Sequence, residues 1–413
     1  MLPEAFISRM RALLGNEAEA FLAALEDEPV RALRINRIKA GDTSAEALCP
    51  FPLKPLGYDP DGYIFDEAHI GYSPLHHGGG VYVQDPGAMS AAAALPLQKG
   101  MRVADLCAAP GGKTAQLAVA VGEEGEVYAN EFVSSRAKIL VGNLERLGVK
   151  NAVVTSTDTA DYKKWFSAYF DAVVVDAPCS GEGMFRKNEG AIGEWSEENE
   201  RTVLEFLRSH PDYELIEVNA AVRDHTADGI ALPDAGGVPL HFCRRFYPHI
   251  APGEGQFIAL MQRKTDDLPT LLYKDASVSP QKEEKRIAEE FIKTTLELPK
   301  DMRLRRVGDT LSLIKESQAV PPHAVFLSGV CLGRVEKGRL VPHHQLFSAL
   351  GKYFRERVFL SEANALRYLR GEELEGGRGS GYVAVCYGAL TLGGAKLAAG
   401  RLKNHYPKGL RNP

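Results

Sequence analysis

Residues 102–114 read RVADLCAAPGGKT, and this stretch decides the fold. Its first five residues, 102–106, are typical of a short buried strand, and a helix is expected to begin near Thr114. Between them lie glycines, which let the backbone approach a ligand closely, and the first N–H groups of the helix point at the same gap. The stretch therefore predicts a ligand-binding loop between a strand and a helix.

Strands and helices alternate downstream of this loop. A helix over 134–147 has apolar residues on one face, with Ser134 or Ser135 as its expected cap and Gly148 as its stop. Three more short apolar strands are expected, at 127–129, 153–155 and 172–175. This alternation predicts an α/β fold with a Rossmann-like parallel sheet covered by helices on both faces.

Acidic residues fall at or just after the ends of these strands, namely Glu131, Asp158 and Asp176. Ligands of parallel sheets bind at the carboxyl ends of the strands, so these side chains are expected to surround the loop. Glu131 is placed to accept hydrogen bonds from both hydroxyls of a ribose, and Asp158 to bind an adenine amine. The pattern therefore favours an adenosyl cofactor.

Three other interpretations of the loop are possible, and the sequence disfavours each of them. The GKT at 112–114 resembles a phosphate-binding P-loop, but that motif requires a glycine where this chain has Cys107. A dinucleotide fold requires GxGxxG, which is absent. A glycine turn can also be purely structural, but two further acids at strand ends favour a nucleotide-like ligand.

The segment DAPCSGEGMFRK (176–187) follows the fourth predicted strand. A thiolate at Cys179 is able to attack a substrate or act as a base, although a free cysteine is more often a small buried residue. Asp176 is able to bind the exocyclic amine and ring nitrogen of a cytosine, or else it caps the following turn. Arg186 and Lys187 are able to meet phosphate or to lie on a solvated loop.

The overall composition limits which classes of protein this chain can belong to. The chain has 413 residues, a net charge of −5, 45% hydrophobic and 25% charged residues, which predicts two or three globular domains. Any positive surface for nucleic acid must therefore be local. The six cysteines are scattered, without a CxxC pair or a Cys/His cluster, so neither a metal site nor a disulfide framework is expected. No long apolar run predicts a membrane span, and a cytoplasmic protein is expected.

The sequence predicts three modules, with boundaries at 1–95, 96–265 and 266–413. The first begins with two helical patterns and continues with proline-rich connections, and the last has short glycine-separated strands. The last 22 residues, 392–413, contain no acid and five basic residues, which are Lys396, Arg401, Lys403, Lys408 and Arg411. They form either a solvated tail or a patch that contacts phosphate.

Three segments resemble a known family: ADLCAAPGGKTAQLA (104–118), NEFVSSRAKILVGNLERLG (130–148) and DAVVVDAPCSGEGMFRK (171–187). They look like hallmark segments of bacterial RNA 5-methylcytosine methyltransferases of the Nol1/Nop2/Sun class, and the resemblance extends across nearly the whole chain. LKNHYPKGLR (402–411) resembles the end of the branch that modifies 16S ribosomal RNA. The resemblance implies a class I methyltransferase sheet, an N-terminal α+β RNA-binding module and a C-terminal β-rich module related to PUA domains.

The resemblance also implies ligands and roles. The implied cofactor is S-adenosyl-L-methionine. The implied partner is RNA, either 16S ribosomal RNA or a small-subunit assembly intermediate, and the protein is expected to be a monomer. The family's cysteine adds to carbon 6 of cytosine, carbon 5 takes the methyl group, a base removes the carbon 5 proton, and the thiol leaves. Cys179 would be the second cysteine, which helps to release the product. The cofactor pocket would be lined by Cys107, Ala108, Ala109, Pro110, Gly111, Gly112, Lys113, Glu131, Asp158 and Asp176.

The chain departs from the family at the nucleophile. In the family, a Thr-Cys segment follows a further helix and strand and precedes a helix that begins with ENE. Here the later helix, within EENERTVLEFLRSHPDYEL (197–215), follows 193–195 directly, and no Thr-Cys remains in the chain. About one βα unit is therefore missing.

This loss has a structural and a chemical consequence. The lost strand belongs beside the fourth strand, so its absence should leave unpaired backbone and an exposed apolar face. Cys179 is one replacement nucleophile, because DNA cytosine-5-methyltransferases have theirs in a Pro-Cys after the fourth strand, whereas Cys243 is expected in the core. The alternative is a degenerate relative that binds RNA and cofactor without methyl transfer.

Overall fold

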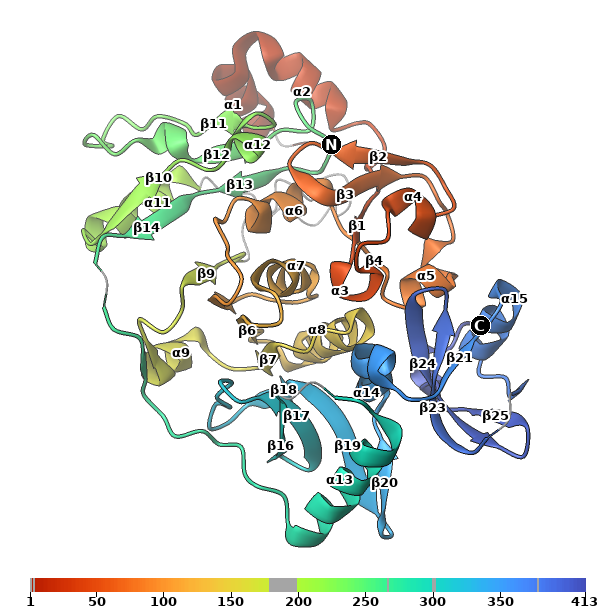
Figure 1. Cartoon of the computed structure of the whole chain (residues 1–413). Coiled ribbons are helices and arrows are strands. Elements are labelled where there is room, and N and C mark those ends of the chain that lie inside the picture. Colours follow the sequence, from red (N-terminus) through yellow and green to blue (C-terminus); the bar gives the residue numbers. More distant parts are fainter. Residues whose placement is uncertain (1, 3, 178–198, 266, 299–301, 377–378) are drawn as a thin grey trace.

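A computed structural model describes residues 2, 4–177, 199–265, 267–298, 302–376 and 379–413. Its centre is the parallel sheet that the sequence predicts, flanked by the N-terminal module on one side and by two C-terminal sheets on the other (Figure 1). The central strands are β5 (Arg102–Asp105), β6 (Glu126–Asn130), β7 (Ala152–Thr155) and β9 (Ala172–Val174). The helices that connect them are α7 (Gly112–Val121), α8 (Ser134–Leu147) and α9 (Thr159–Trp165).

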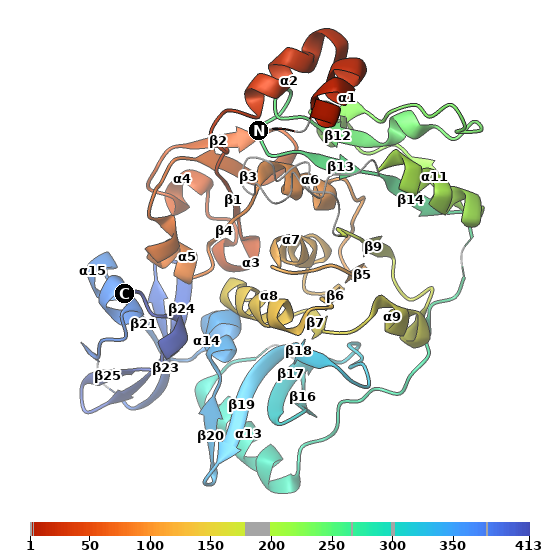
Figure 2. The same cartoon turned by 180° about the vertical axis from the view of Figure 1, so that it is seen from behind.

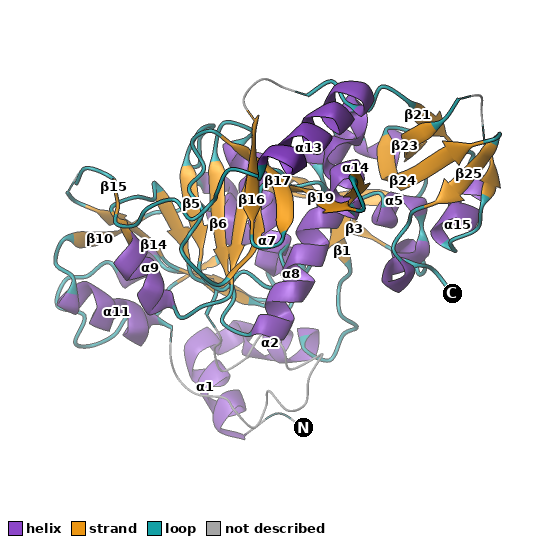
Figure 3. Ribbon diagram, turned by 90° about the horizontal axis from the view of Figure 1, so that it is seen from below, coloured by secondary structure: helices purple, strands orange, loops and turns teal. Residues whose placement is uncertain are grey.

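The strands of this sheet have neighbours in the order β18-β7-β6-β5-β9. Helices α7 and α8 lie against it in the view from below (Figure 3), and every residue of β6 and β7 is buried. Aliphatic side chains of α7 and α8 form one core, and an aromatic cluster around Tyr128 and Trp165 forms another. The prediction of a sheet covered on both faces is confirmed.

Helix α8 has the predicted bounds, but its predicted cap is wrong. The residue at the cap is Val133, without a side-chain cap, because Ser134 and Ser135 are already the first helical residues. The predicted stop is confirmed, since Gly148 has a left-handed backbone with φ of 72° and its N–H binds Glu145 O.

The N-terminal module is an α+β unit with a four-stranded sheet in the order β2-β3-β1-β4. Its strands are β1 (Ala32–Ile35), β2 (Leu53–Leu56), β3 (Asp59–Phe65) and β4 (Val81–Val83). Its helices are α1 (Glu4–Leu14), α2 (Ala18–Ala24), α3 (Arg37–Ala40), α4 (Ala45–Leu48), α5 (Pro74–His77) and α6 (Pro86–Ala93). Seen from behind, α5 lies beside the C-terminal half of the chain (Figure 2), where His77 Nδ1 and Tyr406 Oη are 2.7 Å apart.

The C-terminal region contains two sheets, where the sequence predicts one β-rich module. The first, in the order β16-β17-β19-β20, is covered by α13 and α14, and the second has the order β21-β23-β24-β25-β22. The first unit comprises α13 (Lys282–Thr295), β16 (Met302–Val307), β17 (Thr310–Lys315), β18 (Val325–Ser328), β19 (Val330–Glu336), β20 (Arg339–Pro342) and α14 (His344–Leu350). The second comprises β21 (Arg357–Phe359), α15 (Glu362–Leu369), β22 (Leu374–Glu375), β23 (Gly381–Tyr387), β24 (Leu390–Ala398) and β25 (Arg401–Asn404).

The basic residues at the end of the chain do not lie on a solvated tail. Lys396 lies on β24 and Arg401 and Lys403 lie on β25, in the middle of the last sheet. Arg401 Nη1 is 3.3 Å from Glu373 Oε1. The tail alternative is therefore wrong, because leucines between these basic residues, such as Leu397 and Leu402, are buried in the core of this unit.

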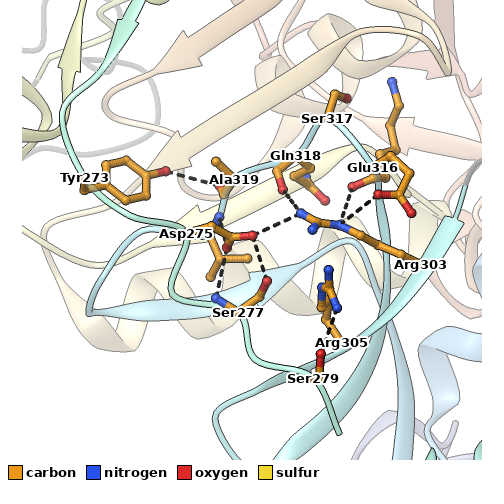
Figure 4. A network of polar contacts seen from close by, with 12 residues as sticks. Tyr273, Asp275, Ser277, Ser279, Arg303, Arg305, Glu316, Ser317, Gln318 and Ala319 are labelled. Carbon is orange, nitrogen blue, oxygen red and sulfur yellow. Dashed lines mark hydrogen bonds and ion pairs between the residues drawn. The ribbon is translucent and has the colours of Figure 1, made fainter.

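The C-terminal region contributes one strand, β18, to the central sheet. The sequence did not predict this strand as part of the central sheet. Strand β18 pairs antiparallel with β7, with Leu327 opposite Val154. The segment that precedes α13 is fixed nearby (Figure 4): Tyr273 Oη donates to Ala319 O at 3.3 Å, and Arg303 Nη2 is 3.0 Å from Asp275 Oδ2. Contacts between residues this far apart in the chain produce no periodic pattern in the local sequence, so sequence patterns cannot predict them.

The opposite edge of the sheet is open. Within the described ranges, β9 pairs with β5 alone. From residue 199 on, the described chain forms two separate small sheets and adds no strand beside β9. These sheets and their helices comprise α11 (Glu200–Ser209), β10 (Tyr213–Ile216), α12 (Ala220–Arg223), β11 (Ala227–Asp228), β12 (Arg244–Phe246), β13 (Gln256–Ile258) and β14 (Leu260–Arg263). A short pair, β8 (Phe166–Ser167) with β15 (Thr270–Leu271), lies apart from them.

Apolar side chains are exposed at this edge. Val173 is 48% exposed and Val175 is 62% exposed, although strands of a complete parallel sheet are normally buried. The predicted exposed apolar face is therefore seen at Val173 and Val175, whereas the predicted unpaired backbone stays a prediction.

An open apolar edge should promote association between chains, and a charge on it should reduce that association. We expect Val173→Lys to lower concentration-dependent light scattering and to change the free energy of unfolding by less than about 1 kcal/mol. The matched control is Ile139→Lys on α8, because Ile139 is also exposed, at 56%, but lies away from the edge. Equal effects of the two substitutions would contradict this role of the edge.

Candidate active site and cofactor pocket

The two glycines of the loop have different tasks. Gly111 has φ of 114° and precedes α7, a backbone conformation that side chains other than glycine rarely adopt. A Cβ on Gly112 would lie 2.8 Å from Tyr82 Cε1 and 3.0 Å from Gln84 Oε1. Gly112 therefore allows the N-terminal module to pack closely on the loop, a role that the sequence did not predict.

The loop is fixed from β6 and from α8. Ala108 N donates to Asn130 O at 2.8 Å. From α8, Arg136 Nη2 donates to Ala109 O at 3.1 Å and Asn143 Nδ2 donates to Pro110 O at 2.8 Å. The shape of the loop is therefore set before any ligand binds, which lowers the conformational entropy lost on binding.

Asp105, the last residue of β5, is a site residue that the sequence analysis missed. Its Oδ2 accepts a hydrogen bond from Thr114 Oγ1 at 2.7 Å, whereas its buried Oδ1 makes no hydrogen bond of normal geometry among the described residues. Burial raises the pKa of Asp105 to about 6, against the opposing effects of the Thr114 hydrogen bond and the Lys113 charge. The signal was an acid at the strand end directly before the glycine loop.

The unused oxygen of Asp105 fits an amino-acid-bearing cofactor. A buried acceptor without a donor is costly, and an ammonium group in the pocket would remove that cost. S-adenosylmethionine carries such a group, so the residues present fit this cofactor.

Glu131 follows β6 and is held beside the loop. Its side chain is 4% exposed, its Oε1 accepts from Val133 N at 2.9 Å, and its Oε2 is 3.3 Å from Arg136 Nη1. Arg136 also binds the loop carbonyl of Ala109. The carboxylate therefore has a fixed position relative to the loop, and its predicted contact to ribose hydroxyls stays a prediction.

Asp158 has a structural task in the described chain. Its Oδ1 accepts from Ala160 N at 2.8 Å and caps α9. The predicted contact with the adenine amine stays a prediction.

Asp176 is brought to the loop from the fourth strand. Its Oδ2 lies 2.8 Å from Lys113 Nζ, with the two side chains 40% and 12% exposed. Cys179, Arg186 and Lys187 lie outside the described residues. Asp105, the loop, Glu131 and Asp176 thus meet at the carboxyl edge of the sheet, as such ligand sites do.

The other cysteines are poorly suited to nucleophilic attack. Cys49, Cys243, Cys331 and Cys386 are all buried, and Cys243 is confirmed as a core residue. Burial raises the thiol pKa of the first three to about 11, 12 and 11, and it raises the pKa of Cys386 as well. Cys107 is half-buried in the loop, and burial with nearby acids raises its pKa too.

Three family models match this chain. The model described as 16S rRNA methyltransferase RsmB/F matches residues 92–192. The N-terminal domain of 16S rRNA methyltransferase RsmF matches 2–86, and the methyltransferase RsmF PUA domain matches 355–412. The PUA match thus covers the second C-terminal sheet and not the whole of 266–413.

Curated relatives match over nearly their whole length. The ribosomal RNA small subunit methyltransferase F of Shewanella sp. (strain ANA-3) is 28% identical, over 94% of this chain and 92% of the relative. The protein of that name from Vibrio cholerae serotype O1 (strain M66-2) is 26% identical, over 99% and 97%. That alignment spans 461 positions, 48 more than the 413 residues here, so the relative has residues without a counterpart in this chain.

Solved structures share the fold. The structure of PH0851 has a TM-score of 0.55 and 22% identity, over 63% of this chain and 66% of that chain. A methyltransferase homolog protein from Pyrococcus horikoshii has a TM-score of 0.51 and 25% identity, over 64% and 95%.

The fold and the loop define a class I S-adenosylmethionine-dependent methyltransferase. The three family models and the curated relatives narrow this class. The chain belongs to the Nol1/Nop2/Sun class of bacterial RNA 5-methylcytosine methyltransferases. RNA is therefore its partner, which the PUA unit also supports.

The described residues show neither a metal site nor a membrane-spanning helix. In the part of the chain that the structure describes, no group of three or more His, Cys, Asp or Glu side chains is arranged to hold a metal ion. None of the described helices has the length and apolar character needed to cross a bilayer.

Affinity for the cofactor should depend on the ionisation of Asp105. The pKa of its carboxyl is raised to about 6, so protonation below that pH removes the charge that attracts an ammonium group. We expect the affinity for S-adenosylhomocysteine to fall as pH drops through about 6. Asp105→Asn should bind more weakly at neutral pH and lose this dependence, as measured by calorimetry.

The same shift has the opposite sign for the stability of the cofactor-free protein. A carboxyl with a raised folded-state pKa contributes stability that is fully present below its unfolded pKa and is lost as pH rises through about 6. For the cofactor-binding experiment, the control variant is Glu145→Gln. Burial raises the pKa of Glu145 to about 7, but Glu145 lies away from the loop, so this variant should keep the pH dependence of cofactor binding. A pH dependence of cofactor binding that survives in Asp105→Asn would contradict this assignment.

Proposed function

We propose that this chain transfers a methyl group to carbon 5 of a cytosine in 16S ribosomal RNA. The observation that carries the proposal is the 2.8 Å contact between Asp176 and Lys113 of the cofactor loop. This contact puts an acid suited to cytosine beside the loop that fits the methyl donor. The names of the curated relatives, which are small-subunit ribosomal RNA methyltransferases, support the choice of RNA.

The side chains divide the task between holding and activating the base. Asp176 is 40% exposed and able to accept a hydrogen bond from the exocyclic amine of cytosine. S-adenosylmethionine supplies an electrophilic methyl group. Because carbon 5 of cytosine is a poor nucleophile, a thiolate must first add to carbon 6; after methyl transfer a base removes the carbon 5 proton and the thiol leaves.

Cys179 is the thiol that we assign to this addition. Four of the other five cysteines are buried with raised pKa values, and Cys107 belongs to the cofactor loop. Cys179 follows Asp176 by only three residues in the sequence, which supports a shared task for this thiol and the acid proposed to bind the base. The Thr-Cys segment of the family offers no competitor because the sequence lacks it.

We further propose that the protein acts as a monomer in the cytoplasm. Its substrate, ribosomal RNA of a bacterial small subunit, is made and assembled in that compartment. The RNA-binding parts would be the N-terminal module and the PUA unit, which match family models at 2–86 and 355–412.

A mechanism-based trap tests both the reaction and the thiol. RNA with 5-fluorocytidine should form a stable covalent adduct, because fluorine at carbon 5 cannot leave as a proton. We expect the parent to give a slow-migrating protein–RNA band and to transfer labelled methyl to unmodified 16S ribosomal RNA. Cys179→Ala should lose both signals, whereas Cys49→Ala, which removes a buried thiol of the N-terminal module, should keep them.

The outcomes separate the two functions that the sequence leaves open. A parent that binds RNA and cofactor but gives neither adduct nor methyl transfer would be a binding protein without this chemistry. An adduct that persists in Cys179→Ala would overturn the assignment of the thiol.

Restoring the missing unit provides a second test. The RsmB/F model match ends at Ile192, close to the predicted deletion between Trp195 and Ser196. We expect that inserting the corresponding segment of the Vibrio cholerae relative there raises methyl transfer by at least about 100-fold, since it supplies the Thr-Cys nucleophile. It should also raise the melting temperature, because a strand would cover β9.

The control for this insertion is the same segment with its cysteine replaced by alanine. That protein should show the gain in melting temperature without the gain in methyl transfer. An insertion that fails to raise the melting temperature would contradict the assignment of a missing strand beside β9.

A further inference from the structure

A cavity of about 540 Å³ lies between the methyltransferase domain and the first C-terminal sheet. One wall is the second half of α8, and the others are the end of β16, strands β17 to β20 and the loops between these strands. The cavity exists because β18 joins the central sheet beside β7, which carries the C-terminal unit across α8. Both domains therefore contribute to one site that neither forms alone.

The cavity is separate from the cofactor pocket. Its residues on α8 are Val141 and Glu145, whereas Arg136, which binds the cofactor loop, lies near the start of that helix. At 1.5 Å per residue, Glu145 is roughly 14 Å along the helix axis from Arg136. A ligand in this cavity would leave the cofactor loop free.

One polar group without a partner among the described residues and one loose ion pair line this space. Ser328 is 2% exposed, and its Oγ makes no hydrogen bond. Glu145 is 17% exposed, and its Oε1 is 3.7 Å from His343 Nδ1. Burial raises the pKa of Glu145 to about 7 and lowers the pKa of His343, so near neutral pH the carboxyl is able both to donate and to accept.

The balance of charge argues against an anionic ligand. One basic residue, Arg334, lines the cavity together with two acids, Glu145 and Glu336. A phosphate group requires more positive charge than this. A metal ion is equally unsupported, because the described part of the chain has no cluster of metal-binding side chains here.

The apolar walls favour a flat, neutral ligand. Phe326 is 37% exposed and lines the cavity, and the remaining apolar lining is aliphatic. These aliphatic residues are Val141, Val307, Val325, Leu327, Val341 and Pro342. An aromatic ring beside buried donors and acceptors suits a heterocycle with apolar faces and a hydrogen-bonding edge.

We propose that this interdomain cavity binds an unstacked nucleobase, either of an RNA strand or of a free nucleoside. Phe326 packs against the face of the base, and Ser328 and Glu145 bind its edge. Only the choice of RNA as one source rests on the proposed function. The site would hold a second nucleotide of the RNA while a cytosine occupies the active site.

Fluorescence of 2-aminopurine measures this binding in the full chain. Excess S-adenosylhomocysteine fills the cofactor pocket, so that any adenosine-like probe must bind elsewhere. One arm uses a short single-stranded RNA with one 2-aminopurine, and the other uses free 2-aminopurine riboside. We expect quenching in the parent and about tenfold weaker binding in Phe326→Ala and in Ser328→Ala.

The matched control is Phe359→Ala. Phe359 is an exposed phenylalanine on strand β21, 61% exposed, and does not line the cavity, so its removal should leave binding of the riboside unchanged. Quenching of the RNA probe alone would identify the ligand as a base within a strand, and quenching of the riboside alone would identify it as a free nucleoside. The absence of quenching with both probes, or equal losses in Phe326→Ala and Phe359→Ala, would overturn the proposal.

This test is independent of methyl transfer. A parent that forms no adduct with 5-fluorocytidine RNA but quenches 2-aminopurine would have the cavity site without the proposed reaction. A parent that forms the adduct but shows no quenching would have the reaction without this site.

Discussion

One ladder of backbone hydrogen bonds, between β5 and β9, positions the catalytic edge of this protein. Its parallel register puts Asp105 opposite Val174, so both strands end together and Asp176 emerges beside the cofactor loop. The ion pair of Asp176 with Lys113, 2.8 Å long, then joins the chain after β9 to the first turn of α7. The missing strand removes the other neighbour of β9 but not this ladder, so the acid keeps its place.

The far edge of the same sheet shows the opposite situation. There β18 adds a strand from the C-terminal region, and buried polar contacts join this region to the N-terminal module. Lys39 Nζ donates to Ser348 O at 2.5 Å, and burial lowers its pKa to about 7, while His77 binds Tyr406 and Asn412. The N-terminal module and the PUA unit therefore have fixed positions relative to the carboxyl edge of the sheet, which suits a folded RNA partner.

Local sequence was sufficient for the sheet, the glycine loop and the position of Glu131, because each depends on neighbours within a few residues. It was insufficient wherever a distant segment decides the role of a residue. The sequence predicts Gly112 as a glycine that lines the cofactor pocket but does not predict that Tyr82 packs against it. Likewise, β18 joins β7 through pairing between segments far apart in the chain. The sequence prediction included the acids that follow the later strands but not Asp105, which ends the first strand, before the glycine loop.

The absent unit affects the residues for cofactor binding and the residues for covalent attack on cytosine differently. Asp105, the loop and Glu131 all precede β9, in elements that are complete and packed, so the cofactor pocket does not depend on the missing unit. The resemblance to the family implies that the absent unit would place a strand beside β9 and supply the thiol that attacks cytosine. The sheet keeps enough contacts to hold Asp176, so this carboxylate stays beside Lys113 of the cofactor loop without a further strand on β9 among the described residues.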